Sequence, residues 1–200
     1  MPRESGRNDR RNHIAYLAAR LMAEEGIEDY ALAKRKAARQ TGAADTRELP
    51  TNDEIDAALR AHQQIYHGEE HRERLRELRR RALRAMRELA EFNPHLTGSV
   101  LHGNAGRYAG IHIQLYTDNE KAVELYLIDR DIPYRATQRR LFCGEDVLTA
   151  PVFTIDDGGT AVELTVLSMR ELRGRLRTSV EGKHIERAKL QAVEQLLAET

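Results

Sequence analysis

The fold is decided by Leu96-Thr97-Gly98-Ser99-Val100 and by the stretch that follows it, Ile111-His112-Ile113-Gln114-Leu115. The first stretch brings apolar residues to a Gly-Ser turn. The second alternates apolar and polar residues, which is the pattern of a β-strand with one buried face. Ile111, Ile113 and Leu115 are expected on one side of this strand, and His112 and Gln114 on the other.

Downstream of this stretch, the sequence predicts more strands and helices. Asp156-Asp157-Gly158-Gly159 has the composition of a hairpin turn, and Pro151 suggests an edge strand or a bend. Asp118 is a suitable N-cap for the helix that follows the first strand. Strands are expected over residues 108–117, 139–143, 147–155 and 161–167, and helices over 118–128 and 183–198, after a linker over 179–182.

Upstream, apolar residues recur at three- and four-residue steps, which predicts helices over 13–25, 29–40, 51–66 and 70–92. Thr51 and Glu54 have the spacing of a capping box, Gly68 is expected to separate the last two helices, and Pro94 to stop the series. The polar residues 1–11 are expected to form a mobile basic arm. The predicted class is therefore α+β: a helical N-terminal half, residues 1–92, then a mostly antiparallel sheet with packed helices, residues 93–200.

The Gly98-Ser99 turn, a ten-residue interval and Gly110-Ile111-His112-Ile113 together resemble the signature of the DNA polymerase β-type nucleotidyltransferase superfamily. In that superfamily, a Gly-Ser turn precedes a strand that carries two acidic residues in an acid-apolar-acid arrangement. A third acid lies on a later strand. The resemblance covers roughly residues 92–167 and implies a nucleotidyltransferase-like fold. It also implies Mg²⁺ or Mn²⁺ held by carboxylates, which align the attacking hydroxyl and neutralise the leaving phosphate.

The sequence departs from this signature at the acidic positions. The first two fall on Gly110 and His112, and the third falls on Glu163. Glycine supplies no ligand, and neutral histidine is a poor ligand for Mg²⁺. The resemblance therefore implies a degenerate member with impaired or lost catalysis, in which Glu163 would be the catalytic metal ligand if activity is retained. The expected contacts to a nucleotide or RNA phosphate are Gly98, Ser99, His112 and Gln114.

The arginine-rich helix over 70–92 supports an alternative function, a non-enzymatic module that binds RNA or a protein. Guanidinium groups match the geometry of phosphate, although a packed helix with a charged outer face explains the same pattern. The apolar seam from Leu75 to Phe92 would pack inside the chain or pair with a second copy of it. The candidate contacts to phosphate or a partner are Lys34, Arg35, Arg79, Arg80 and Arg81.

Composition excludes some classes of function. The 32 basic and 32 acidic residues give a formal net charge of zero, so no global field favours nucleic acid or an anionic membrane. The single cysteine, Cys143, cannot form an intrachain disulfide, which fits the reducing cytoplasm. No apolar run approaches the length of a membrane span, so a membrane is not an expected partner.

Overall fold

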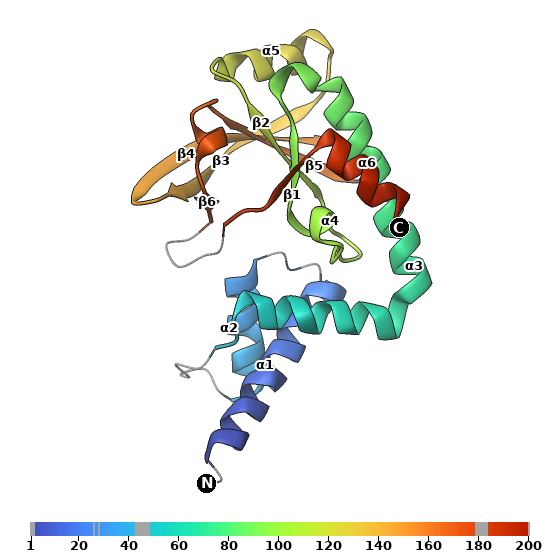
Figure 1. Cartoon of the computed structure of the whole chain (residues 1–200), viewed down its shortest axis with the longest axis vertical. Coiled ribbons are helices and arrows are strands. Elements are labelled where there is room, and N and C mark those ends of the chain that lie inside the picture. The colour runs from blue at the N-terminus through green and yellow to red at the C-terminus, as the bar shows by residue number, and fades with distance from the viewer. Residues whose placement is uncertain (1–2, 26, 28, 43–48, 179–183, 200) are drawn as a thin grey trace. The chain divides into compact units, whose positions relative to one another are not determined.

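The structure is a computed structural model that describes residues 3–25, 27, 29–42, 49–178 and 184–199 (Figure 1). The chain divides into two compact units, which are described separately. Unit 1 comprises Met1–Arg74 with Asn104–Ala109, and unit 2 comprises Leu75–Gly103 with Gly110–Thr200. The class is α+β, as the sequence predicted: a helical N-terminal region is followed by a mixed seven-stranded sheet with helices. The domain boundary proposed at residue 92 stays a prediction.

Unit 1 is built from α1 (Arg3–Glu25), α2 (Tyr30–Gln40) and the first part of α3 (Asn52–Glu88). Helix α1 begins at Arg3, so the stretch expected as an arm is helical. Its polar turns carry no apolar periodicity, which is why the sequence placed the start near residue 13. Helix α2 begins as predicted, because Asp29 caps it by accepting from the N–H groups of its first turn at 2.7 and 3.2 Å. The buried core of unit 1 includes Ile14, Ala18, Ala37, Ile55 and Leu59.

Helix α3 is one continuous helix, so the predicted break at Gly68 is wrong. A glycine inside a helix costs about 1 kcal/mol relative to alanine, which good helix formers on both sides outweigh. The capping box at its start is confirmed: the Thr51 N–H donates to Glu54 Oε2 at 2.6 Å, and the Glu54 N–H donates to Thr51 Oγ1 at 3.2 Å. The helix gives way to a short 3₁₀ turn, η1 (Ala90–Phe92), before the sheet begins.

Unit 2 contains the sheet, whose strand order is β6-β3-β4-β5-β2-β1-β7. Among the pairings of the described residues, β2–β5 is parallel and the other named pairs are antiparallel. The strands are β1 (His95–Thr97), β2 (Ile111–Tyr116), β3 (Tyr134–Cys143), β4 (Asp146–Asp156), β5 (Ala161–Leu167), β6 (Leu176–Arg177) and β7 (Arg187–Lys189). The helices are α4 (Gly98–His102), α5 (Glu120–Asp129) and α6 (Leu190–Ala198), and η2 (Glu171–Arg173) is a further 3₁₀ turn.

Three local predictions for unit 2 need correction. Helix α6 begins at Leu190 rather than at residue 183, because Arg187–Lys189 pairs with β1 as an edge strand. Helix α5 has Asn119 as its N-cap, while Asp118 Oδ1 accepts from the Met169 N–H at 3.1 Å. Strand β4 lies inside the sheet, and its proline is tolerated because pairing with β5 begins only at the next residue, Val152. The linker predicted over 179–182 lies outside the described residues.

The two faces of the sheet differ in chemistry. Leu96, Ile113, Leu164 and Phe153 form a cross-strand row in which no side chain is more than 5% exposed. The next residue along each strand projects to the opposite face, where polar side chains predominate near the start of β2. At the other end of that face lies an apolar cluster of Tyr116, Leu141, Ala150, Leu167 and Leu176. The sheet therefore has one apolar face and one mixed face, whose polar side chains lie near the start of β2.

No helix in the described part of the chain combines the length and the apolar character needed to cross a membrane.

Candidate functional site

The candidate site is a row of polar residues across five strands of the sheet, here called the polar row. Register pairs Thr97 with His112, His112 with Glu163, Glu163 with Thr154, and Thr154 with Arg135. Residues paired in this way project from the same face of a sheet. Strands β1, β2, β5, β4 and β3 thus each contribute one side chain to the same surface.

Glu163 is the centre of the polar row. Its Oε2 lies 3.1 Å from His112 Nδ1 and accepts from Arg139 Nη2 at 2.5 Å. The three side chains are partly accessible, at 25% for Glu163, 18% for His112 and 37% for Arg139. The hydrogen bond with His112 lowers the pKa of Glu163 to about 2, helped by the charges of His112 and Arg139 and opposed by burial. The carboxylate is therefore ionised and held between an imidazole and a guanidinium.

The Gly-Ser turn meets the polar row at His112. Gly98 begins α4 with φ +74°, and a Cβ added to it would lie 3.1 Å from Cδ2 of His112. Only glycine accepts both this backbone conformation and this close approach without strain. Thr97 Oγ1 also donates to the His112 carbonyl oxygen at 3.3 Å, and the half-buried Ser99 follows in the first turn of α4. The structure thus places Gly98 close to His112, and His112 against Glu163 of a strand much later in the sequence.

The first acidic position of the signature has no room for a side chain. Gly110 precedes β2, and a Cβ built on it would lie 3.1 Å from the carbonyl oxygen of Ala161. A carboxylate at this position would force the neighbouring backbone of β5 to move. The glycine therefore reflects the close approach of two strands.

The residues present do not fit the two-metal site that the resemblance implies. Glu163 is the only carboxylate in the polar row, and its Oε2 is already engaged by His112 and Arg139. Within the described ranges, no group of three or more His, Cys, Asp or Glu side chains is arranged to hold a metal ion. A divalent cation at Glu163 would be repelled by the Arg139 guanidinium, which carries charge of the same sign and contacts the carboxylate. The metal role expected for Glu163 is thus left without partner ligands.

Gln114 lies in the same strand but is buried, at 4% exposure. Its Oε1 accepts from the Tyr116 hydroxyl at 2.7 Å, and that hydroxyl accepts from Arg187 Nη1 at 2.7 Å. Arg187 also donates to the carbonyl oxygens of Leu172 and Gly174, at 2.7 and 3.0 Å. Gln114 is thus part of an internal network, and its contact with a nucleotide stays a prediction.

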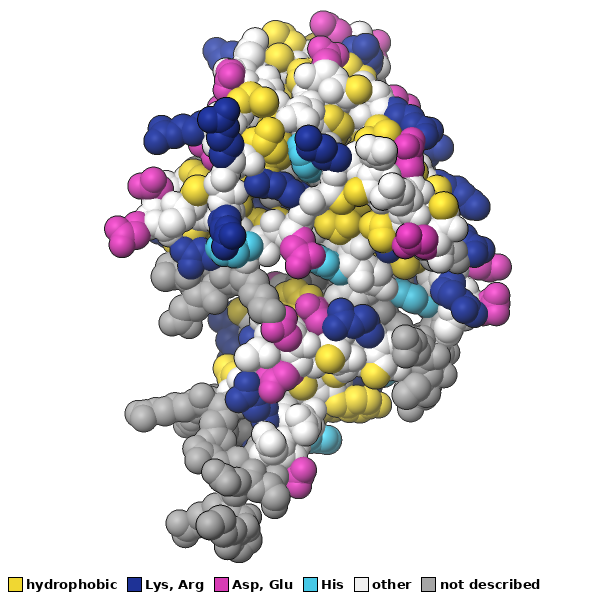
Figure 2. Space-filling view, in the orientation of Figure 1, with side chains coloured by type: hydrophobic (Ala, Val, Ile, Leu, Met, Phe, Trp, Pro, Cys, Tyr) yellow, Lys and Arg dark blue, Asp and Glu magenta, His cyan; other side chains and the backbone are white. Residues whose placement is uncertain are grey.

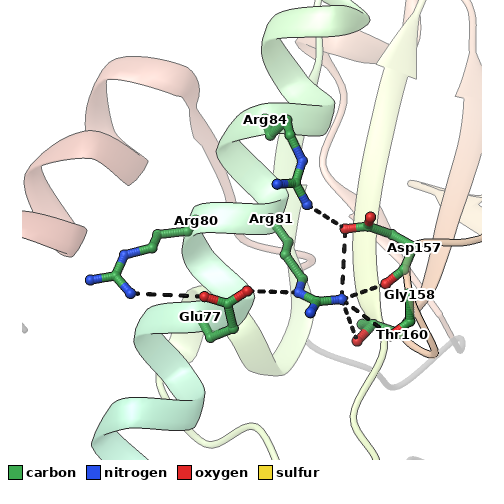
Figure 3. Close-up of polar contacts among 7 residues, drawn as sticks. All are labelled: Glu77, Arg80, Arg81, Arg84, Asp157, Gly158 and Thr160. Carbon is green, nitrogen blue, oxygen red and sulfur yellow. Dashed lines mark hydrogen bonds and ion pairs between the residues drawn. The ribbon is translucent and has the colours of Figure 1, made fainter.

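Two of the candidate arginines of α3 are used inside unit 2. Arg79 is 6% exposed, and its guanidinium donates to the carbonyl oxygens of Val100, Leu101 and Leu196 at 3.1 to 3.4 Å. Arg81 donates to Glu77 at 2.9 Å and to the Asp157 carbonyl oxygen at 2.5 Å (Figure 3). Both arginines therefore fasten α3 to other elements of the unit.

Of the other candidate basic residues, Arg80 and Arg35 are exposed and Lys34 is half-buried. Arg80 is 61% exposed and lies 3.8 Å from Glu77 (Figure 3). On α2 in unit 1, Arg35 is exposed, whereas Lys34 is half-buried and burial lowers its pKa. On the visible face, Figure 2 shows basic and acidic side chains interspersed rather than one continuous basic surface, as expected for zero net charge.

The apolar seam from Leu75 to Phe92, which runs along α3 into η1, is buried. Leu75, Leu78, Ala82, Leu89 and Phe92 are each 6% exposed or less. The packed-seam interpretation accounts for them, and these side chains offer no surface to a second copy of the chain.

Sequence reasoning missed Arg139 and Arg135. The sequence did contain a sign of them: alternate residues of β3, namely Arg135, Thr137 and Arg139, project from one face of the strand. Their nearness to Glu163 depends on the strand order β3-β4-β5, which the sequence does not show.

Comparison with known proteins adds no family to this description. No protein-family model matches the chain, and no curated protein gives a significant match to it.

Proposed function

We propose that this protein is nucleotidyltransferase-like and binds a nucleotide or RNA phosphate at the polar row, with catalysis impaired or lost. The observation that carries the proposal is the meeting of three signature positions. Gly98 lies so close to the ring of His112 that an added Cβ would be 3.1 Å from it, and that ring lies 3.1 Å from Oε2 of Glu163. The spacing in the sequence and the register of the sheet thus favour one surface.

The proposed loss of nucleotidyl transfer follows from the number of carboxylates at the three acidic positions of the signature. Nucleotidyl transfer by two metal ions needs several oxygen ligands to align the attacking hydroxyl and the leaving phosphate. Here one of the three positions is acidic, and its carboxylate is engaged by Arg139. The resemblance would assign any surviving transfer of a nucleoside monophosphate to Mg²⁺ or Mn²⁺ on Glu163, a role for which the polar row supplies no second carboxylate. The cytoplasm is part of the proposal, since the single Cys143 fits a reducing compartment.

The test is a calorimetric titration of the full chain with each nucleoside triphosphate and with a short RNA, in the presence of Mg²⁺ or Mn²⁺. Binding by at least one of these ligands is expected, and Ser99→Ala and Glu163→Ala should change its affinity. Arg140→Gln is the matched control, because Arg140 projects from the opposite face of β3. Absence of binding by every nucleotide and by RNA would overturn the proposal.

The exposure of Arg80 keeps the alternative function, an RNA- or protein-interaction module on α3, open to test. Phosphate-driven binding on this helix should weaken steeply as salt rises and should fall when Arg80 is neutralised. Affinity for RNA that responds to Arg139 but not to Arg80 would exclude α3 as the binding surface.

A further inference from the structure

We infer that Arg139 and Arg135 take the place of the metal ions in this site, so that a nucleotide phosphate binds to guanidinium groups without a divalent cation. The inference rests on the proposed function and specifies its chemistry. It follows from the mismatch between the ligands that the resemblance implies and the residues that surround Glu163.

The first step is the position of Arg139. Its Nη2 contacts Oε2 of Glu163, the carboxylate that would otherwise ligate a metal ion. A guanidinium carries five N–H donors, more than one carboxylate oxygen can accept. Since the Arg139 side chain is 37% exposed, part of it reaches solvent and can meet a ligand. A fixed positive charge thus stands beside Glu163 where the signature requires a metal ion.

The second step is the position of Arg135. It lies four residues before Arg139 on β3, so both project from the face that carries the polar row. Arg135 is exposed, and its register partner Thr154 is itself paired with Glu163. Two guanidinium groups therefore lie on β3 on the same face as Glu163, and one of them, Arg139, contacts its carboxylate. Guanidinium forks bind phosphate oxygens in a bidentate manner, which suits a nucleotide di- or triphosphate.

The third step is the exclusion of a cation. Oε2 of Glu163 is shared by His112 and Arg139, and Gly110 offers no oxygen ligand from a side chain. A divalent ion would gain a single carboxylate, one of whose oxygens is already shared, and it would face the charge of Arg139. For a bound anion the signs are reversed, because Arg139 and Arg135 attract it and Glu163 repels it.

The two accounts of Glu163 predict opposite effects. If Glu163 is a metal ligand, Glu163→Gln weakens nucleotide binding. If Glu163 instead competes with phosphate for Arg139, the same substitution releases the guanidinium and strengthens binding.

The experiment is a calorimetric titration of the full chain with ATP, in EDTA and in Mg²⁺, at low salt. The expected result is an affinity in EDTA within about threefold of that in Mg²⁺, since the arginines supply the cationic charge. Arg139→Gln should weaken binding in EDTA about tenfold or more, and Glu163→Gln should strengthen it several-fold. Arg135→Gln should weaken ATP binding several-fold. Because Arg135 is exposed, this variant still tests the inference if the Arg139 variant fails to fold. Arg140→Gln, on the same strand but the opposite face, should leave ATP binding unchanged.

Two results overturn the inference and leave the proposed function standing: binding that requires Mg²⁺, or weaker binding by Glu163→Gln. Equal affinity of the Arg139, Arg135 and Arg140 variants also overturns it. Absence of ATP binding in both buffers, together with absence of binding by the other nucleotides and RNA, overturns the proposed function and this inference with it.

Discussion

Replacing Glu163 by glutamine should reveal how much the ion pair at the centre of the polar row stabilises unit 2. The substitution removes the charge and keeps the size of the side chain. In the folded protein the pKa of Glu163 falls from its ordinary value of 4.5 to about 2. Each tenfold change in proton affinity corresponds to about 1.4 kcal/mol, so the full effect is about 3 kcal/mol. Because the side chain is 25% exposed, solvent screening reduces this figure, and we expect about 2 kcal/mol at pH 7.

The pH dependence gives the sign of the effect. A carboxyl group with a lowered pKa in the folded state stabilises the protein above the pKa of the unfolded chain, here 4.5, and this stability is lost as the pH falls toward about 2. The part of the difference in unfolding free energy between wild type and Glu163→Gln that comes from titration of Glu163 itself should therefore be constant from pH 7 to about 5. By pH 3 its charge-dependent part should have shrunk to about half or less of its value at pH 7.

Urea denaturation followed by circular dichroism at pH 7, 5 and 3 measures this difference. Glu145→Gln is the control, because Glu145 is exposed in the β3–β4 turn, and its effect should stay within about 0.5 kcal/mol. The reasoning is refuted if Glu163→Gln costs no more than Glu145→Gln at pH 7. It is also refuted if the cost of Glu163→Gln is the same at pH 7 and pH 3.

Three further substitutions test the fold by urea denaturation at pH 7. Arg81→Ala removes the hydrogen bonds between α3 and the β4–β5 turn and should lower the unfolding free energy by about 2 kcal/mol. Arg80→Ala changes a side chain that is 61% exposed and should lower it by less than about 0.5 kcal/mol. Equal effects of the two substitutions would show that the Arg81 bonds do not stabilise unit 2. Gly144→Ala should lower the unfolding free energy by about 1 kcal/mol, because alanine is strained at a positive φ. Gly98→Ala should lower it clearly more, because at Gly98 the new methyl group also meets the imidazole ring of His112. Thr51→Ala should cost about 1 kcal/mol by removing the capping box, and no loss of helix stability would show that the cap is dispensable.

The fold class and most of the strands could be predicted because alternation reports burial directly. In β2 and β5, the apolar positions that alternate in the sequence, such as Ile113 and Leu164, are buried as predicted, although Gln114 and Thr165 on the other face are buried as well. The capping box at Thr51 and the cap at Asp29 were predictable for a similar reason, since a cap is a local hydrogen bond between near neighbours.

The errors of prediction fall where distant contacts override local preference. Residues 187–189 continue a helical pattern in the sequence, but β1 recruits them as an edge strand. Gly68 is a local helix breaker, yet a long helix absorbs its cost. Neither outcome can be read from a window of neighbouring residues, because each depends on what the rest of the chain contributes.

The site was predictable to the extent that it follows one motif. The spacing of the Gly-Ser turn, His112 and Glu163 predicted that they belong together, and the register of β2 with β5 does bring His112 and Glu163 into contact. Arg139 was not predictable in this way. It lies two strands from Glu163 and is paired with Ala150, so only its long side chain brings it to the polar row.

The chemistry of the polar row is consistent when its residues are considered as a set. Three clustered carboxylates repel one another and need bound cations to neutralise them. A lone carboxylate in a partly buried position needs a cation from the protein itself, since an ionised group without a partner is costly there. With glycine and histidine at the other two positions, Arg139 supplies that cation and His112 adds a hydrogen bond. The contacts of Glu163 with Arg139 and with His112 thus meet one requirement, the neutralisation of a partly buried carboxylate.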